Sequence, residues 1–115
     1  QRQIVILARC IVQDSPVMLM DEPDSALDFL NRHMVLSKIR ELIKEENKAG
    51  LITLHDPNFA MAYCDRLLLL KEGRLVGELD MRRAKADEVK MKLSLIYGDI
   101  ELLQSGDSFL MGKAL

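Results

Sequence analysis

Apolar and polar positions along the chain fall into blocks whose spacing predicts its elements. Val17–Met20 and Leu51–Leu54 are short, continuous apolar runs, which are typical of strands buried on both faces. Between these runs, from Phe29 to Lys48, apolar residues recur about every 3.6 positions with charged residues opposite them, which predicts an amphipathic helix. Strand, helix and strand therefore alternate in the first half of the chain.

Residues with strong end preferences mark the limits of the helices. Asp28 is placed to cap the long helix, Ala49-Gly50 to close it, and Pro57 to open a short helix over residues 58–64. Residues 1–12 carry apolar side chains on more than one helical face and have no capping residue ahead of them. We expect the chain to start inside an element.

The second half of the chain reads as hairpins and one further helix. Lys71-Glu72-Gly73-Arg74 lies between two apolar runs and predicts a hairpin, because Gly73 can take the positive φ of a tight turn. A helix from Asp87 to Tyr97 should stop at Gly98, with two short strands around Ser105-Gly106-Asp107. We therefore predict an α/β fold with a mostly parallel sheet flanked by helices, a C-terminal hairpin and a small appended tail. The expected boundary separates residues 1–80 from 81–115.

The composition of the chain argues against several classes of function. The 115 residues include 16 basic and 18 acidic side chains, so no basic field points to nucleic acid. Cys10 and Cys64 are too few for a disulfide scaffold or zinc cluster and are typical of reduced, packed thiols. No apolar run reaches the ~20 residues of a membrane-spanning helix, and no signal pattern opens the sequence. These features predict a cytosolic protein.

The chemistry-bearing residues follow the two apolar strands. Asp21-Glu22 comes after the first strand and His55 after the second, and ligands in open α/β sheets bind beyond the carboxyl ends of strands. We expect Asp21 to face a magnesium ion, Glu22 to accept a proton from an attacking water, and His55 to hydrogen-bond a terminal phosphate. Taken singly, the acid pair fits a turn or helix cap better than a functional site, and His55 fits a structural role better; the surrounding segments favour the functional interpretation of both. His33, inside the long helix, is expected to be structural.

The order of these segments resembles the ATP-binding subunit of ABC transporters. Val17–Glu22 resembles the Walker B strand, Ser25-Ala26-Leu27-Asp28 the D-loop, and His55 the switch histidine. Gln1-Arg2-Gln3 resembles the end of the signature motif and the start of its helix. The resemblance extends from Gln1 to about Leu79 and implies a partial P-loop NTPase fold.

The resemblance also implies cofactors and partners. ATP and Mg2+ would be bound, with Asp21 holding the metal, Glu22 acting as general base, and Gln1, Ser25 and Asp28 contributing to nucleotide sites of a dimer. A second nucleotide-binding subunit and transmembrane permease subunits would be partners, nucleic acid would not, and the protein would be cytoplasmic and peripheral to the inner face of the membrane. The stretch after His55 is similar to importers of iron chelates and other metal complexes.

The sequence departs from this family at several motifs: besides the phosphate loop, no glutamine loop can be placed, and the Ser-Gly-Gly of the signature motif is missing ahead of Gln1. It contains no Gly-x-x-x-x-Gly-Lys-Ser/Thr phosphate loop, so we expect the intact parent to be an ATPase and this chain alone to be inactive. Two alternatives are a non-enzymatic dimerisation module and the head domain of a DNA-maintenance ATPase; the Gly73 hairpin and the absence of coiled-coil heptads disfavour the second. Open sheet edges predict self-association or rearranged strand pairing.

Overall fold

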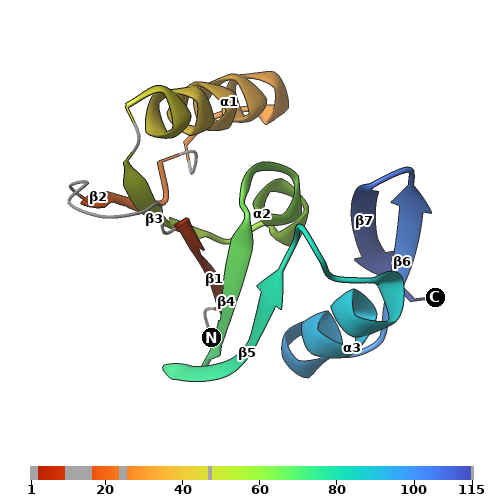
Figure 1. Ribbon diagram of the computed structural model, residues 1–115. Helices are drawn as coiled ribbons and strands as arrows, with labels where there is room; N and C mark the ends of the chain where they lie inside the picture. Colours follow the sequence, from red (N-terminus) through yellow and green to blue (C-terminus); the bar gives the residue numbers. More distant parts are fainter. Residues whose placement is uncertain (1–2, 10–16, 24–25, 47, 115) are drawn as a thin grey trace.

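The computed structural model describes residues 3–9, 17–23, 26–46 and 48–114, with only the backbone described for residues 3–9 and Met18. The elements in chain order are β1 (Gln3–Arg9), β2 (Val17–Asp21), α1 (Phe29–Glu45), β3 (Ala49–Leu54), α2 (Pro57–Tyr63), β4 (Arg66–Lys71), β5 (Arg74–Asp80), α3 (Ala86–Tyr97), β6 (Ile100–Ser105) and β7 (Ser108–Lys113). Helices and strands are arranged as an α/β fold (Figure 1), which confirms the predicted class.

The main sheet has five strands in the order β2-β3-β1-β4-β5, and β6 pairs with β7 in a separate hairpin. Only the β2–β3 pair is parallel, whereas β1–β3, β1–β4 and β4–β5 are antiparallel. The prediction of a mostly parallel sheet is therefore wrong for the described residues. The cause is β1, which runs against both of its neighbours.

The opening stretch forms a strand where the resemblance to the signature motif implied the start of a helix. Residues 3–9 lie between β3 and β4, with Val5 opposite Leu54 on one side and Leu69 on the other. The β-branched run Ile4-Val5-Ile6 suits a strand, and pairing on both sides satisfies the inner edges of β3 and β4. Tertiary hydrogen bonding therefore decides the conformation of this segment.

The two strands that carry the candidate site differ in burial. In β3 the even-numbered residues are buried, whereas Val17 and Leu19 of the edge strand β2 are 61% and 72% exposed. The expectation that both strands are buried on both faces is thus wrong. The closing role expected for Ala49-Gly50 is also wrong, because both residues belong to β3 and α1 ends at Glu45.

The helix and turn signals are otherwise confirmed. The Asp28 side chain caps α1 by accepting a hydrogen bond from the Asn31 N–H at 2.9 Å, and Pro57 occupies the first turn of α2. Glu72 and Gly73 join β4 to β5 with φ values of 52° and 77°, as a two-residue hairpin loop with two positive φ angles requires.

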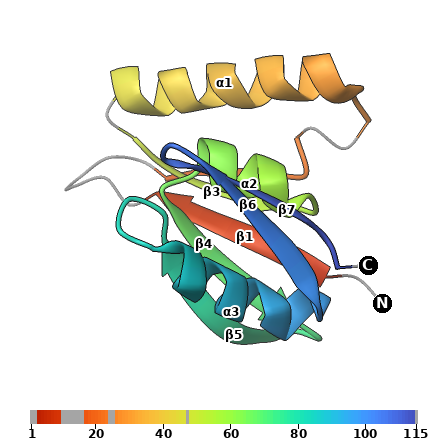
Figure 2. The same cartoon turned by 90° about the vertical axis from the view of Figure 1, so that its right-hand side faces the viewer.

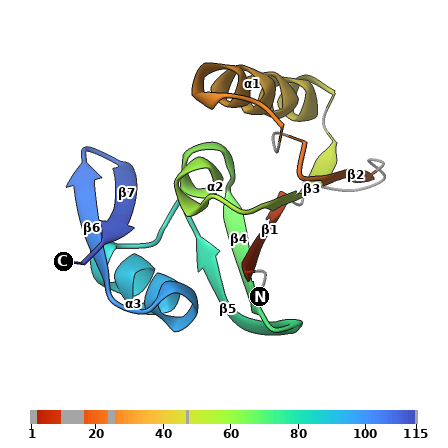
Figure 3. The ribbon, with the colours of Figure 1, turned by 180° about the vertical axis from the view of Figure 1, so that it is seen from behind.

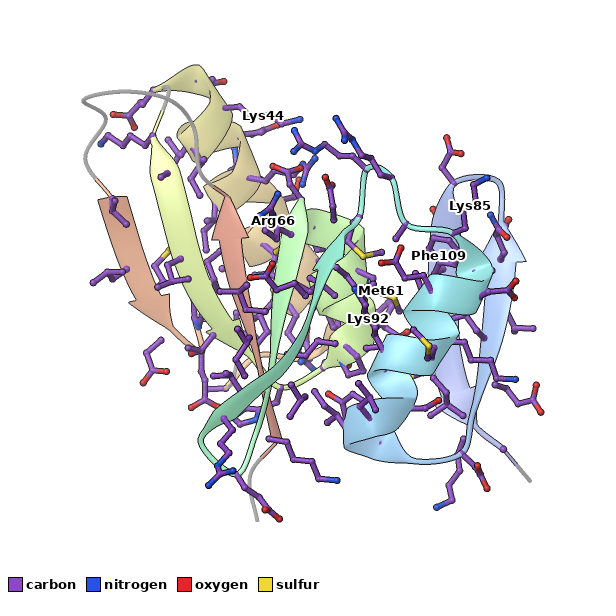
Figure 4. All side chains as sticks on the ribbon, turned by 60° about the horizontal axis from the view of Figure 1, so that its bottom comes forward. Lys44, Met61, Arg66, Lys85, Lys92 and Phe109 are labelled. Carbon is purple, nitrogen blue, oxygen red and sulfur yellow. The ribbon has the colours of Figure 1, made fainter. Side chains whose placement is uncertain are left out.

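The C-terminal segment packs into the same core as the sheet. In Figure 1, α1 lies above the sheet, whereas α3 and the β6–β7 hairpin lie to the right of β5 and α2; Figure 2 brings the hairpin to the front, and Figure 3 shows the view of Figure 1 from behind. Val89, Leu93 and Ile96 of α3 are buried in one cluster with Leu67 and Leu69 of β4. Met61 of α2 and Phe109 of β7 belong to this packing and lie between the sheet and the hairpin (Figure 4). The core thus crosses the boundary predicted at residue 80, and that boundary stays a prediction.

Candidate functional site

Asp21, Glu22 and His55 lie together at one edge of the sheet. Asp21 ends β2, Glu22 follows it, and His55 follows β3; because these strands are parallel neighbours, their carboxyl ends meet. Glu22 Oε1 is in ion-pair contact with His55 Nε2. The structure therefore brings together the three residues that the sequence singled out.

Thr53 of β3 forms hydrogen bonds with both acids, and it was not among the site residues predicted from the sequence. It lies opposite Asp21 in the β2–β3 register, and its hydroxyl donates a hydrogen bond of 2.5 Å to Asp21 Oδ1. The Glu22 N–H donates to the same hydroxyl oxygen at 2.9 Å and to the Thr53 carbonyl oxygen at 3.1 Å. The sequence did contain an indication of Thr53, because residues two positions apart on a strand share a face and Thr53 lies two positions before His55.

The backbone of Glu22 has the left-handed conformation, with φ of 46°. This region is unusual for a non-glycine residue and costs on the order of 1–3 kcal/mol. Adjacent residues of a regular strand point to opposite faces of the sheet. Instead both reach the end of β3, Asp21 at Thr53 and Glu22 at His55, because the turn at Glu22 ends the regular alternation.

The site is partly open to solvent. The Glu22 and His55 side chains are 21% and 37% exposed, and Asp21 borders a shallow hollow whose walls include Leu19, Leu51 and Thr53. Among the described residues, no group of three or more His, Cys, Asp or Glu side chains could hold a metal by itself. A single exposed carboxylate fits Mg2+, which usually binds through one or two carboxylates together with substrate phosphates and waters. Asp21 is the residue here that would hold it.

Of the remaining predicted site residues, the structure describes Asp28 but not Gln1 or Ser25. Gln1 and Ser25 lie outside the described residues, as does Asp24, which adds a third acid to this segment in the sequence. Asp28 is described, and its carboxylate caps α1. Its expected second role, at a dimer contact, stays a prediction.

The segment after His55 is fixed at two positions, Asp56 and Asn58. Asp56 caps α2 by accepting from the Asn58 N–H at 2.8 Å and lies 3.9 Å from the Arg32 guanidinium. The Asn58 side chain then pairs with the backbone of Met111 in β7, donating to its carbonyl at 3.0 Å and accepting from its N–H at 2.6 Å. Through Asn58, the C-terminal hairpin holds the helix that follows the candidate site.

His33 belongs to the packing between α1 and α2, as expected of a structural residue. Its ring contacts Phe59 at a centroid distance of 4.4 Å, and its Nδ1 lies 2.5 Å from the Tyr63 hydroxyl oxygen. Arg40 donates to the Tyr63 carbonyl oxygen at 2.5 Å and to Asp65 at 3.3 Å. These contacts attach α1, which begins just after the acid pair, to the helix that begins just after His55.

Cys64 follows α2 and behaves as the packed thiol that the sequence predicted. Burial raises the pKa of Cys64 to about 12, which outweighs the opposing effect of the nearby Arg40 guanidinium. A thiol with this pKa stays protonated and unreactive at neutral pH. Cys10 lies outside the described residues.

An acid pair and an imidazole at the ends of two parallel strands, on an α/β scaffold, are compatible with a nucleotide-hydrolysing domain, and comparison with known proteins gives the class. The chain is related to the ATP-binding proteins of ABC transporters. No protein-family model matches it. It spans about two fifths of the length of two of the curated relatives it matches, so it corresponds to part of such a protein.

Individual relatives come from several transport systems. The chain is 35% identical to the phosphonates import ATP-binding protein PhnC 3 of Nostoc sp. over 107 residues, which are 93% of this chain and 39% of that protein. It is 37% identical to the hemin import ATP-binding protein HmuV of Vibrio parahaemolyticus, covering 85% of this chain and 38% of the relative. The family resemblance seen in the sequence ended at about Leu79. The match to PhnC 3 extends well past that residue and into the C-terminal segment.

A solved structure gives the same answer for the fold. A metal-chelate type ABC transporter in an inward-facing conformation superposes with a TM-score of 0.61 at 27% identity, covering 84% of this chain and 38% of that one. Among the described residues, no helix is long and apolar enough to cross a membrane.

Proposed function

We propose that this chain is part of the ATP-hydrolysing subunit of an ABC transporter and supplies the metal-binding acid, the general base and the switch histidine. The observation that carries the proposal is the contact between Glu22 and His55 beside Asp21, at the joined ends of two parallel strands. The relatedness to ABC transporter ATP-binding proteins supports it.

Each residue has a role suited to its chemistry. Asp21 would hold Mg2+, which supplies positive charge to the phosphate oxygens. Glu22 orients the attacking water and accepts its proton, since a positioned carboxylate can act as a general base. His55 donates a hydrogen bond to the terminal phosphate and steadies the charge that develops there. These are positioning and electrostatic roles, as expected for phosphoryl transfer.

The partners follow from the same proposal. A phosphate loop must come from outside this sequence, and two subunits pair so that Gln1, Ser25 and Asp28 approach nucleotide sites at their interface. The dimer would bind transmembrane permease subunits from the cytoplasmic side, as a peripheral protein of the inner face.

For the cargo, we propose import of an iron chelate or another metal complex. Relatives named for hemin and cobalamin import, together with the metal-chelate type transporter structure, support this choice. The phosphonates relative represents the competing cargo class. Transport of labelled substrates by the complete transporter in vesicles would separate them, and uptake of phosphonate but of no metal complex would refute this part of the proposal.

The decisive experiment is Glu22→Gln in the complete subunit. We expect Mg-ATP binding to be retained and hydrolysis to fall by about 100-fold or more, because an amide cannot accept the proton. Glu101→Gln, which makes the same change on an exposed strand position, should leave turnover unaltered. Unchanged hydrolysis in the Glu22→Gln variant would remove Glu22 from the mechanism.

A further inference from the structure

We infer that Thr53 is a positioning residue that sets the geometry of both acids through its single hydroxyl. This inference rests on the proposed function, because it assigns Thr53 a part in the same reaction. The Thr53 hydroxyl forms hydrogen bonds with both acids: it donates to Asp21 Oδ1 at 2.5 Å and accepts from the Glu22 N–H at 2.9 Å.

The direction of these hydrogen bonds is fixed by chemistry. A backbone N–H only donates, so the hydroxyl oxygen must be its acceptor, and the one hydroxyl hydrogen is then left for the Asp21 carboxylate. A hydrogen bond to a charged acceptor is stronger than one between neutral groups, which favours one orientation of that carboxylate. Thr53 thereby orients the group that would hold Mg2+.

The Thr53 hydroxyl also supports the backbone of Glu22. Its φ of 46° is unfavourable and must be maintained by surrounding contacts. The Glu22 N–H is shared between the hydroxyl and the carbonyl oxygen of Thr53, and these bonds hold the turn against β3. The Glu22 carboxylate then reaches His55. Loss of the hydroxyl should loosen the turn and move the general base.

Two substitutions separate the hydroxyl from the shape of the side chain. Thr53→Val keeps the branched shape and removes the hydrogen bonds, while Thr53→Ser keeps the hydroxyl. Ser94→Ala is the matched control, since it removes a hydroxyl whose bond is to the Lys90 carbonyl oxygen in α3.

In the complete subunit, we expect Thr53→Val to lower kcat by about tenfold or more while KM for ATP changes by less than about threefold. Thr53→Ser should restore kcat to within about threefold of the parent, and Ser94→Ala should not change it. A Thr53→Val variant that is folded by circular dichroism and has the kcat of the parent would overturn the inference.

A measurement on the 115-residue chain keeps this test separate from the proposed function. Hydrogen exchange at the Glu22 amide should become about tenfold faster in Thr53→Val, and the NMR signals of the His55 ring should shift. The chain has two histidines, so His33→Asn assigns the rings. Unchanged exchange and ring signals would overturn the positioning role. If they change while Glu22→Gln still hydrolyses ATP normally, the proposed function fails and the catalytic part of this inference fails with it.

Discussion

The packing of α1 on β3 leaves no room for a side chain at Gly50. Ile43 of α1 is 3% exposed and lies over Gly50. A Cβ at Gly50 would be 2.3 Å from Ile43 Cδ1 and 3.4 Å from Ile43 Cγ1. The first distance is a severe overlap, whereas the second is tight but tolerable.

Gly50→Ala should therefore destabilise the chain. Overpacking of a buried site costs about 1–3 kcal/mol, and the lower entropy of alanine in the unfolded chain offsets about 0.4–1 kcal/mol of it. We expect a net loss of roughly 1–2 kcal/mol in the free energy of unfolding and a fall in Tm of about 4–10 °C. Urea denaturation followed by circular dichroism measures this change.

A second substitution should remove the destabilisation caused by Gly50→Ala. Ile43→Val removes the overlapping Cδ1 at a cost of about 0.5–1.5 kcal/mol. In that background, Gly50→Ala should be neutral or stabilising, which gives a coupling free energy of about 1–3 kcal/mol in the double-mutant cycle. If Gly50→Ala costs the same in both backgrounds, contact with Cδ1 is not the cause and the reasoning is wrong.

Further predictions concern the C-terminal segment and buried ionisable groups. Asn58→Ala should cost about 1–3 kcal/mol and speed hydrogen exchange in β6 and β7, because it leaves the Met111 backbone unpaired; unchanged exchange would contradict the docking role. Tyr97→Phe should be neutral or stabilising in urea denaturation, because among the described residues the Tyr97 hydroxyl is buried without a hydrogen-bond partner. The pKa values of Cys64 and Tyr97 are raised from 9.0 and 10.0 to about 12 each, so their contribution to stability is complete below pH 9 and is lost as pH rises towards 12. Cys64→Ser should reduce this alkaline loss, and an equal loss in that variant would refute the assignment.

Elements defined by local chemistry were predictable from the sequence. The Asp28 cap, Pro57 at the start of α2 and the Glu72-Gly73 turn each depend on a few neighbouring residues, and all are found where the pattern placed them. The strand ends at Asp21 and His55 were predictable for a similar reason, because the end of an apolar run followed by polar residues is visible in the sequence.

Features that depend on distant pairing were not predictable. The strand conformation of residues 3–9 comes from hydrogen bonds to β3 and β4, and no residue within that segment indicates that it pairs with these strands. The role of Thr53 depends on its register with Asp21 across the sheet and on the unusual φ of Glu22. Local patterns indicated which residues carry the chemistry, but only the pairing showed how they are held.

The central position of β1 has a consequence for how the chain acquires its structure. The two halves of the sheet join only when the amino-terminal strand finds partners that lie near residues 54 and 69 in sequence, so large loops must close first. Such non-local pairing slows folding, whereas the β4–β5 and β6–β7 hairpins can assemble early from neighbouring residues. The last step to complete the sheet is then expected to be the insertion of β1 between β3 and β4.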